Sequence, residues 1–237
     1  MTRLPSELHR LYHPLIDADG RVRAMVLSIL GRPADWDALS LVWRAVQSEL
    51  DWPAPAIAVS GTDGYQLWFS LEEAAPLEEV HAFFAALRDR YLNHLAPTRI
   101  GIAPAMDSGA SQTSGHADLV PGREVLAGQW SAFVAPDLAP IFAETPWLDI
   151  PPSPEGQAEL LSRLQRIKPA AWQLALAKWR PAPEVPGPAS APASPPAAGM
   201  HLDPRRFLLD VMSDETVALA LRIEAAKALL PRTRHGG

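Results

Sequence analysis

The residues 56–71 carry the polar groups best placed for binding chemistry in this sequence. Ser60-Gly61-Thr62-Asp63-Gly64-Tyr65-Gln66 offers hydroxyl, carboxylate and amide groups between two apolar runs. Two runs with β-propensity around a five-residue connection that contains glycines are typical of a hairpin with a loop or bulge. Strand side chains alternate between two faces, so Gln66, Trp68 and Ser70 should share the less apolar face of the second strand. We therefore expect a binding loop that leads into a strand carrying Gln66.

Several other classes of chemistry have no sequence support. The sequence contains no cysteine, which excludes disulfides, thiolate catalysis and thiolate metal sites. Nothing in it forms a Walker loop, a nucleophile elbow or a zinc cluster. Any metal would need oxygen or imidazole ligands, and a folded domain without visible activity is a serious alternative.

Composition and charge narrow the class of protein further. The 237 residues are 48% hydrophobic and 20% charged, as expected of a folded protein and not of a disordered one. The formal charge of −6 argues against a strong sequence-independent grip on nucleic acid and leaves room only for a local basic groove. No run approaches the ~18 apolar residues that span a bilayer, and the N-terminal residues lack the apolar core of a secretory signal. We expect a cytoplasmic protein with no membrane partner.

The elements that would position the loop follow an order of strand, helix, hairpin and helix. A hairpin over 15–30 turns at Asp17-Ala18-Asp19-Gly20, and the continuously apolar 24–30 predicts a central strand buried on both faces. Helices are expected over 33–50 and 77–95 from their apolar spacing. This order predicts an α+β fold, a mixed or antiparallel sheet with packed helices.

The rest of the chain adds shorter elements and an appendage. We predict, in order, a strand at 99–102, a surface loop at 107–115, a strand at 129–134, a short helix at 137–147 and a helix at 155–167. Residues 181–199 are almost entirely Pro, Ala, Ser and Gly, a composition that stays extended. We therefore expect a domain over 1–180, a linker over 181–199 and a helical docking segment over 200–237.

The order of these elements, together with the loop motif, resembles one known protein family. A buried strand, a Trp-bearing helix, then Ser60-Gly61-Thr62-Asp63-Gly64-Tyr65-Gln66-Leu67 and another helix resemble the archaeo-eukaryotic primase superfamily, which includes polymerase domains of bacterial end-joining ligases. The family pattern in the loop reads SGxGxH or close to it. The resemblance implies a Ser and a His that hold nucleotide phosphates, a D-x-D on a preceding strand and a later third carboxylate. Those acids bind two divalent metals, Mg²⁺ or Mn²⁺, which clamp the attacking and leaving oxygens of nucleotidyl transfer.

The family's loop pattern matches this sequence with one difference. Ser60, Gly61 and Gly64 match, whereas Gln66 stands at the histidine position. Glutamine can donate a hydrogen bond to phosphate but cannot become cationic. The phosphate-binding part of the site would therefore be neutral.

The metal-binding acids of the family match this sequence less well than the loop does. Two alignments of the D-x-D motif are possible. In the first, Ser28 and Leu30 of the buried strand stand where the acids should be. In the second, Asp17 and Asp19 spell D-x-D, although the following glycine suits a turn equally well. We favour the first, because a sheet strand holds a metal site better than a turn tip. Asp118 is the best match for the third acid.

These matches and mismatches favour a degenerate primase-like domain that keeps a nucleotide or single-stranded nucleic acid surface and has lost catalysis. If activity remains, Mg²⁺ or Mn²⁺ would be the cofactor, and the metal ligands would be Asp17, Asp19 and Asp118. The expected nucleotide-binding residues are Ser60, Gly61, Thr62, Gly64, Gln66, Trp68, Arg99 and Arg123.

A non-enzymatic scaffold is the opposed hypothesis. It would act through a protein partner bound by residues 200–237, whose stretches 203–212 and 221–231 are similar to a helical segment of phage small-terminase-like and other mobile-element proteins. Both resemblances favour a function in a mobile element or in DNA processing. The acidic net charge does not support such a function.

Overall fold

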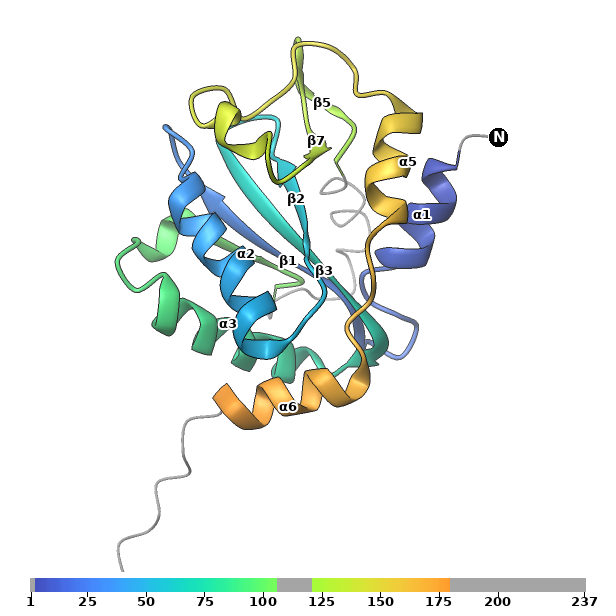
Figure 1. The fold of residues 1–237 in the computed structure, drawn as a ribbon, viewed down its shortest axis with the longest axis vertical. Coiled ribbons are helices and arrows are strands. Elements are labelled where there is room, and N and C mark those ends of the chain that lie inside the picture. The colour runs from blue at the N-terminus through green and yellow to red at the C-terminus, as the bar shows by residue number, and fades with distance from the viewer. Residues whose placement is uncertain (1–2, 106–120, 180–237) are drawn as a thin grey trace, which may run out of the picture. The chain divides into compact units, whose positions relative to one another are not determined.

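The computed structural model describes residues 3–105 and 121–179, and its centre is a five-stranded sheet. The strand order is β4-β1-β3-β2-β7, and every named pair in it is antiparallel. Helices pack on both faces, so the predicted α+β class with an antiparallel sheet is confirmed (Figure 1). The predicted loop 107–115, the linker 181–199, the segment 200–237 and Asp118 lie outside the described residues.

The described elements follow one another with short connections. In chain order they are α1 (Leu4–Leu11), β1 (Val22–Leu30), α2 (Trp36–Leu50), β2 (Ala56–Val59), β3 (Gly64–Ala75), α3 (Leu77–Tyr91), the 3₁₀ helix η1 (Pro97–Arg99), β4 (Ile100–Ala103), β5 (Glu124–Leu126), β6 (Gln129–Trp130), β7 (Ala132–Val134), the 3₁₀ helix η2 (Ala139–Phe142), α5 (Pro154–Ser162) and α6 (Pro169–Trp179).

Strand β1 occupies the central position that its apolar run predicts. It pairs with β3 on one side and β4 on the other, and most of its side chains are buried. A bulge between Val22 and Ala24 shifts the register, so Val22 and Met25 enter the same core cluster. Regular alternation between the two faces is therefore interrupted at the start of the strand and holds after the bulge.

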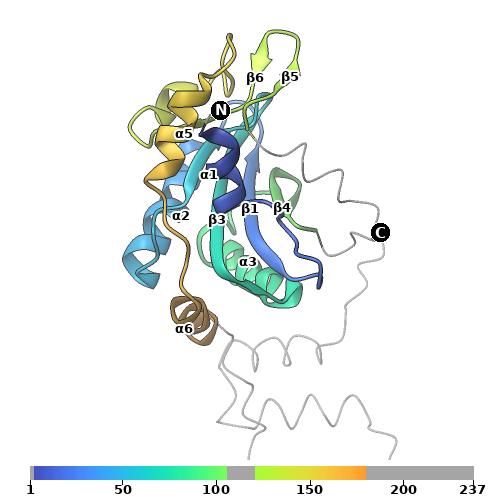
Figure 2. The same ribbon diagram turned by 90° about the vertical axis from the view of Figure 1, so that its right-hand side faces the viewer.

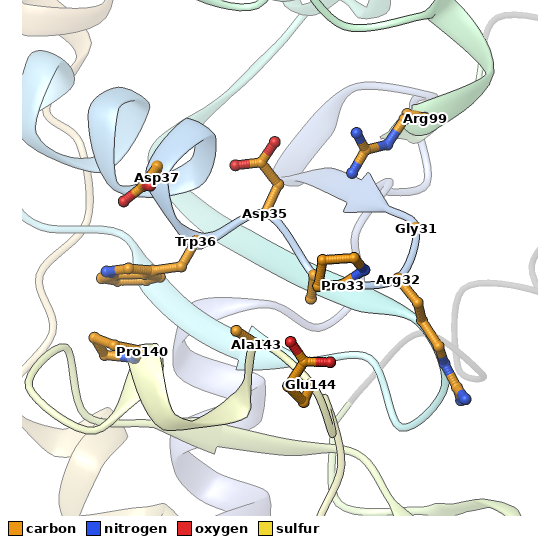
Figure 3. A pocket seen from close by; sticks show the side chains of 11 residues that line it. Gly31, Arg32, Pro33, Asp35, Trp36, Asp37, Arg99, Pro140, Ala143 and Glu144 are labelled. Carbon is orange, nitrogen blue, oxygen red and sulfur yellow. The ribbon is translucent and has the colours of Figure 1, made fainter.

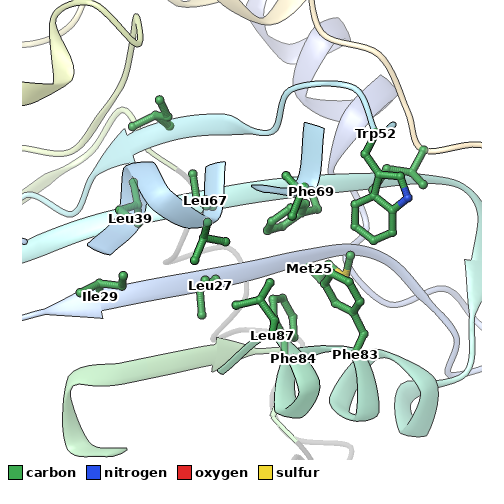
Figure 4. Close-up of a cluster of buried hydrophobic side chains, with 14 of the residues drawn as sticks. Met25, Leu27, Ile29, Leu39, Trp52, Leu67, Phe69, Phe83, Phe84 and Leu87 are labelled. Atoms are coloured by element: carbon green, nitrogen blue, oxygen red, sulfur yellow. The ribbon is translucent and has the colours of Figure 1, made fainter. Parts of the chain in front are cut away.

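The first face of the sheet, covered by α2, α3 and α6, contains the larger core cluster. Leu27 and Ile29 of β1 and Leu67 and Phe69 of β3 meet apolar side chains of the helices there (Figure 4). Trp52, just after α2, is its aromatic centre. As its alternation predicts, β3 places Tyr65, Leu67, Phe69 and Leu71 together on this face.

The second face of the sheet is partly covered by α1 and α5, which lie side by side (Figure 2). Tyr12, Trp68 and Phe133 form its aromatic centre, with ring centroids 5.1 to 5.8 Å apart. The Arg10 guanidinium donates to the carbonyl oxygens of Leu161 and Leu164, which fastens α1 to the end of α5. The second face is therefore built from residues near both ends of the described chain.

Four segments differ from the predicted elements for identifiable reasons. The strand expected at 129–134 divides into β6 and β7 at Ser131, whose hydroxyl accepts from the backbone of Gly122 and Arg123. The helix expected at 137–147 is only η2, because Pro140 and Pro146 limit regular helix. Helix α5 ends at Ser162, after which Ile167 donates to Ser70 and extends along β3. Helix α6 was not predicted, since nearly all its residues are apolar or neutral and no amphipathic stripe marks it.

No helix within residues 3–105 and 121–179 is long and apolar enough to cross a membrane.

We expect the protein to lose stability in alkali through its tyrosines. Burial raises the pKa of Tyr12, and it raises the pKa of Tyr65 to about 12. Burial also raises the pKa of Tyr91 to about 12, helped by its hydrogen bond to Glu49 and that carboxylate's charge. Unfolded tyrosines lose their proton near pH ~10, so this stabilisation is complete below pH ~10 and is lost as the pH rises through the folded values.

Absorbance at 295 nm during an alkaline titration, with circular dichroism alongside, checks this expectation. Phenolate should form above pH ~10 and largely together with unfolding. Tyr91→Phe should reduce the alkaline loss of stability. Ionisation of all three tyrosines near pH ~10 in the folded protein would contradict it.

Candidate functional site

The β2–β3 turn uses the Ser60 hydroxyl as its internal acceptor. Ser60 Oγ accepts from the backbone N–H groups of Thr62, Asp63 and Gly64 at 3.0 to 3.1 Å. The backbone of Ser60 also donates to the carbonyl oxygen of Gly64 at 2.9 Å. A side chain that bonds its own turn in this way holds the turn's shape. Ser60 therefore builds the predicted loop, and Thr62 lies at its half-buried tip.

The two glycines of the turn are required because neighbouring atoms leave no room for a side chain at either position. Gly61 has φ of +85°, and a Cβ there would stand 2.7 Å from Val125 Cγ2. A Cβ on Gly64 would overlap the carbonyl oxygen of Ile29 on β1. Both glycines thus act by allowing the hairpin to pack against its neighbours. Their fit explains the sequence pattern without a ligand.

A single row of residues crosses all five strands of the sheet and includes Gln66. The pairings run from Gly101 to Ser28, from Ser28 to Gln66, from Gln66 to Ala58 and from Ala58 to Phe133. Successive partners in such a row point to the same face. Ser28 is therefore the direct neighbour of Gln66 on the second face. This register places Ser28, which the favoured alignment predicts for the D-x-D, directly beside Gln66, which it predicts for the histidine.

Gln66 is buried and has a fixed amide orientation. It is 8% exposed, and its Oε1 accepts a hydrogen bond from Trp68 Nε1 at 2.9 Å. Trp68 is 1% exposed and packs edge-on against both Tyr12 and Phe133. The structure thus places Trp68 in the core beneath α1, where its contact with the site is the bond to Gln66.

Asp17 and Asp19 lie in the turn before β1, at the opposite end of that strand from the Ser60 turn. Asp17 Oδ1 accepts from the backbone N–H groups of Asp19 and Arg21 at 3.0 and 2.9 Å. Since Val22 pairs near the end of β3 and Leu30 pairs with Gly64, the strand alone separates the two turns by about 26 Å. The structure does not bring these two acids to the Ser60 turn. Among the described residues, no group of three or more His, Asp or Glu is arranged to hold a metal ion.

A separate cavity of about 810 Å³ opens where β1 leads into α2 (Figure 3). Arg99 stands at its edge, and its Nε donates to the carbonyl oxygen of Leu30 at 2.8 Å. Arg32 donates to the carbonyl oxygen of Thr62 at 2.7 Å and stacks 4.7 Å from the centre of the Trp147 ring. The cavity therefore adjoins the Ser60 turn through Arg32, which sequence reasoning did not single out.

Acidic side chains outnumber basic ones in this cavity, so its charge does not favour a polyphosphate. Asp35, Asp37 and Glu144 line it together with the two arginines. Asp35 already caps α2 by accepting from Ala38 at 3.0 Å. Three carboxylates facing two guanidinium groups would repel a strongly anionic ligand. The remaining predicted residue, Arg123, is exposed and precedes β5, where its backbone contacts Ser131.

The candidate site is thus a neutral row on the second face, next to the Ser60 turn. Of the predicted residues, the hairpin brings Ser60, Gly64 and Gln66 together, while Arg99 lies in the neighbouring cavity. Sequence reasoning missed the contribution of Ala58 and Gly101, since only strand register places them beside the two polar residues. No protein-family model matches the chain, and a search of curated proteins finds no match.

Proposed function

We propose that this domain is a catalytically degenerate primase-like domain that binds a nucleotide or single-stranded nucleic acid in a mobile-element or DNA-processing context. The supporting observation is the direct pairing of Ser28 with Gln66. In the favoured alignment these are the positions of a metal-binding acid and of the phosphate-binding histidine. Both positions carry neutral side chains that can donate hydrogen bonds.

The same residues argue against nucleotidyl transfer. A two-metal mechanism needs carboxylates to hold the ions that stabilise the attacking and leaving oxygens. Ser28 and Leu30 provide none at the aligned positions, and Gln66 cannot become cationic. A phosphate at this site would be held by direct hydrogen bonds. Binding, without turnover, is the activity that this arrangement supports.

Binding should depend only weakly on salt. The net charge is −6, and two guanidinium groups near the Ser60 turn, those of Arg32 and Arg99, are already bonded to backbone carbonyl oxygens. For a single strand, the slope of log K against log salt is about −0.7 per neutralised phosphate, so two contacts give a slope of about −1.4. A much steeper slope would require a basic surface elsewhere.

Two assays on the full chain test the proposal. Fluorescence anisotropy with a labelled oligothymidylate and with labelled dATP should show binding of at least one probe. Incorporation of labelled nucleotides on primed and unprimed single-stranded DNA, with Mg²⁺ or Mn²⁺, should be absent. Asp17→Ala/Asp19→Ala should bind as wild type does.

The outcomes separate the competing hypotheses. Incorporation that Asp17→Ala/Asp19→Ala loses would overturn the degenerate assignment and make those carboxylates metal ligands. Binding of neither probe, together with no incorporation, would overturn the proposed function. The scaffold hypothesis would then be tested by whether removal of residues 181–237 abolishes association with a protein partner.

A further inference from the structure

The cavity where β1 leads into α2 is lined by charges of both signs that do not pair with one another. The charged side chains are those of Arg32, Arg99, Asp35, Asp37 and Glu144. Among residues 3–105 and 121–179, no ion pair includes any of these five side chains. Opposite charges in one cavity attract each other, so some other contact must hold them apart. A bound ligand could neutralise them.

The two arginines are held away from the acids by bonds to the backbone. Arg32 donates to the carbonyl oxygen of Thr62, and Arg99 Nε donates to that of Leu30 at 2.8 Å. A Cβ on Gly31 would stand 2.9 Å from Arg99 Nε, so the glycine leaves room for the guanidinium. The terminal nitrogens of Arg99 make no hydrogen bond within the described residues. Arg99 thus presents an anchored fork of donors, which suits a carboxylate.

The acids come from two other segments that line the cavity (Figure 3). Asp35 and Asp37 belong to the start of α2, and Glu144 follows η2. Asp35 uses Oδ1 to cap α2, whereas the carboxylates of Asp37 and Glu144 accept no hydrogen bond from the part of the chain that the structure describes. Ala34 donates to the carbonyl oxygen of Ala143 at 2.7 Å, which ties the two segments together. Two free carboxylates are therefore available to a cationic group.

The size and the remaining lining of the cavity suit a small molecule with an apolar part. Its volume of about 810 Å³ lies in the range of small-molecule sites. The half-buried Trp36 ring lines it and offers a face that attracts cations. Three acids against two arginines give the lining a net charge of 2 − 3 = −1. A ligand with two cationic groups and one carboxylate complements this charge.

We propose that this cavity binds a free basic amino acid, such as arginine or lysine. The ligand's carboxylate accepts hydrogen bonds from the terminal nitrogens of Arg99. Its cationic groups lie against Asp37 and Glu144, and its aliphatic chain lies along Trp36. The site is separate from the row that contains Gln66, so this inference goes beyond the proposed function and does not depend on it.

Isothermal titration calorimetry of the full chain with L-arginine and with L-lysine tests the proposal. Two analogues of arginine are matched controls. Agmatine lacks the carboxylate, and L-citrulline has a neutral side chain. Each analogue loses one charge-assisted contact, so each should bind about 10-fold or more weakly than L-arginine. Affinity for L-arginine should also fall as salt is added, because the contacts are electrostatic.

An Arg99→Met variant tests the carboxylate contact. L-arginine should bind about 10-fold or more weakly to this variant, because its carboxylate has lost a charged partner. Agmatine has no carboxylate and should bind at least as well as it does to wild type. This difference between the two ligands separates loss of the contact from a general loss of structure.

A second variant tests the cationic contacts and does not depend on the anchor of Arg99. Asp37→Asn/Glu144→Gln changes two exposed side chains that bond no other described residue, so it should fold as wild type does. It should weaken L-arginine binding about 10-fold and L-citrulline binding less. Glu72→Gln changes an exposed carboxylate that does not line the cavity and should leave L-arginine binding unchanged.

Several outcomes would overturn this inference. They are the absence of binding of both amino acids in the millimolar range, equal affinity for L-arginine and L-citrulline, and binding of agmatine as tight as that of L-arginine. Wild-type affinity for L-arginine in either cavity variant would overturn it too. None of these results changes the binding of oligothymidylate or dATP, so failure here is distinguishable from failure of the proposed function.

Discussion

Replacement of Trp52 by alanine should lower the free energy of unfolding by about 3–5 kcal/mol, the range for removing a large buried aromatic side chain. Trp52 is 3% exposed and stacks on Phe83 and Trp172, with ring centroids 4.9 and 5.7 Å away. It also meets Phe69 edge-on, and its indole N–H donates to the carbonyl oxygen of Ala171 at 3.3 Å. One side chain therefore joins β3, α3 and α6. Its loss would leave a cavity that no single element can close.

Urea unfolding followed by circular dichroism measures this change. The matched control is Trp147→Ala, because the Trp147 ring is half-buried, bonds Asp149 at 3.1 Å and packs on Arg32. A partly exposed residue of this kind should contribute about 1 kcal/mol or less. Equal losses for the two variants would show that the first-face cluster is not the stabilising centre of the fold.

Gly64→Ala should destabilise the protein by about 3 kcal/mol, at the upper end of the range for overpacking a buried site. The new methyl group would overlap the carbonyl oxygen of Ile29, which belongs to the backbone of β1. A side chain could rotate away, but the strand backbone cannot move without breaking its pairing with β3. The change should therefore disturb the row that contains Ser28 and Gln66 as well as stability.

The control for this variant is Gly156→Ala in α5. A Cβ at that position meets only Ser153, at an ordinary 3.7 Å, and alanine is favoured over glycine in a helix by about 1 kcal/mol. Thermal unfolding should show a lower midpoint for Gly64→Ala and an unchanged or higher one for Gly156→Ala. A midpoint for Gly64→Ala close to that of wild type would contradict the close packing of β1 on the turn.

Local patterns predicted the parts of the fold in which one segment determines its own structure. The continuously apolar 24–30 predicted a central strand, and the spacing of Leu39, Val42 and Val46 predicted the buried face of α2. Alternation from Tyr65 onward assigned the two faces of β3 correctly. These predictions succeeded because side-chain periodicity alone decides which side of an element is buried.

Segments whose structure depends on distant residues could not be predicted in this way. Residues 163–168 have helical composition but extend along β3, where Ile167 bonds Ser70. The sequence also predicted that Trp68 would line the pocket, and nothing in the local pattern indicated that it would be buried beneath Tyr12. Likewise, the neighbouring positions of Ser28 and Gln66 follow from strand register, which depends on the pairing of separate segments.

The contact between α1 and α5 has a consequence for how the chain folds during synthesis. The partners of Arg10, Leu161 in α5 and Leu164 just after it, lie 151 and 154 residues further along the chain. At roughly 5–20 residues per second, the first helix leaves the ribosome about 8 to 30 s before the end of α5 has been made. During that interval α1 lacks the surface on which it packs in the native protein. We expect the first face of the sheet to be assembled earlier, with α1 docking as one of the last steps.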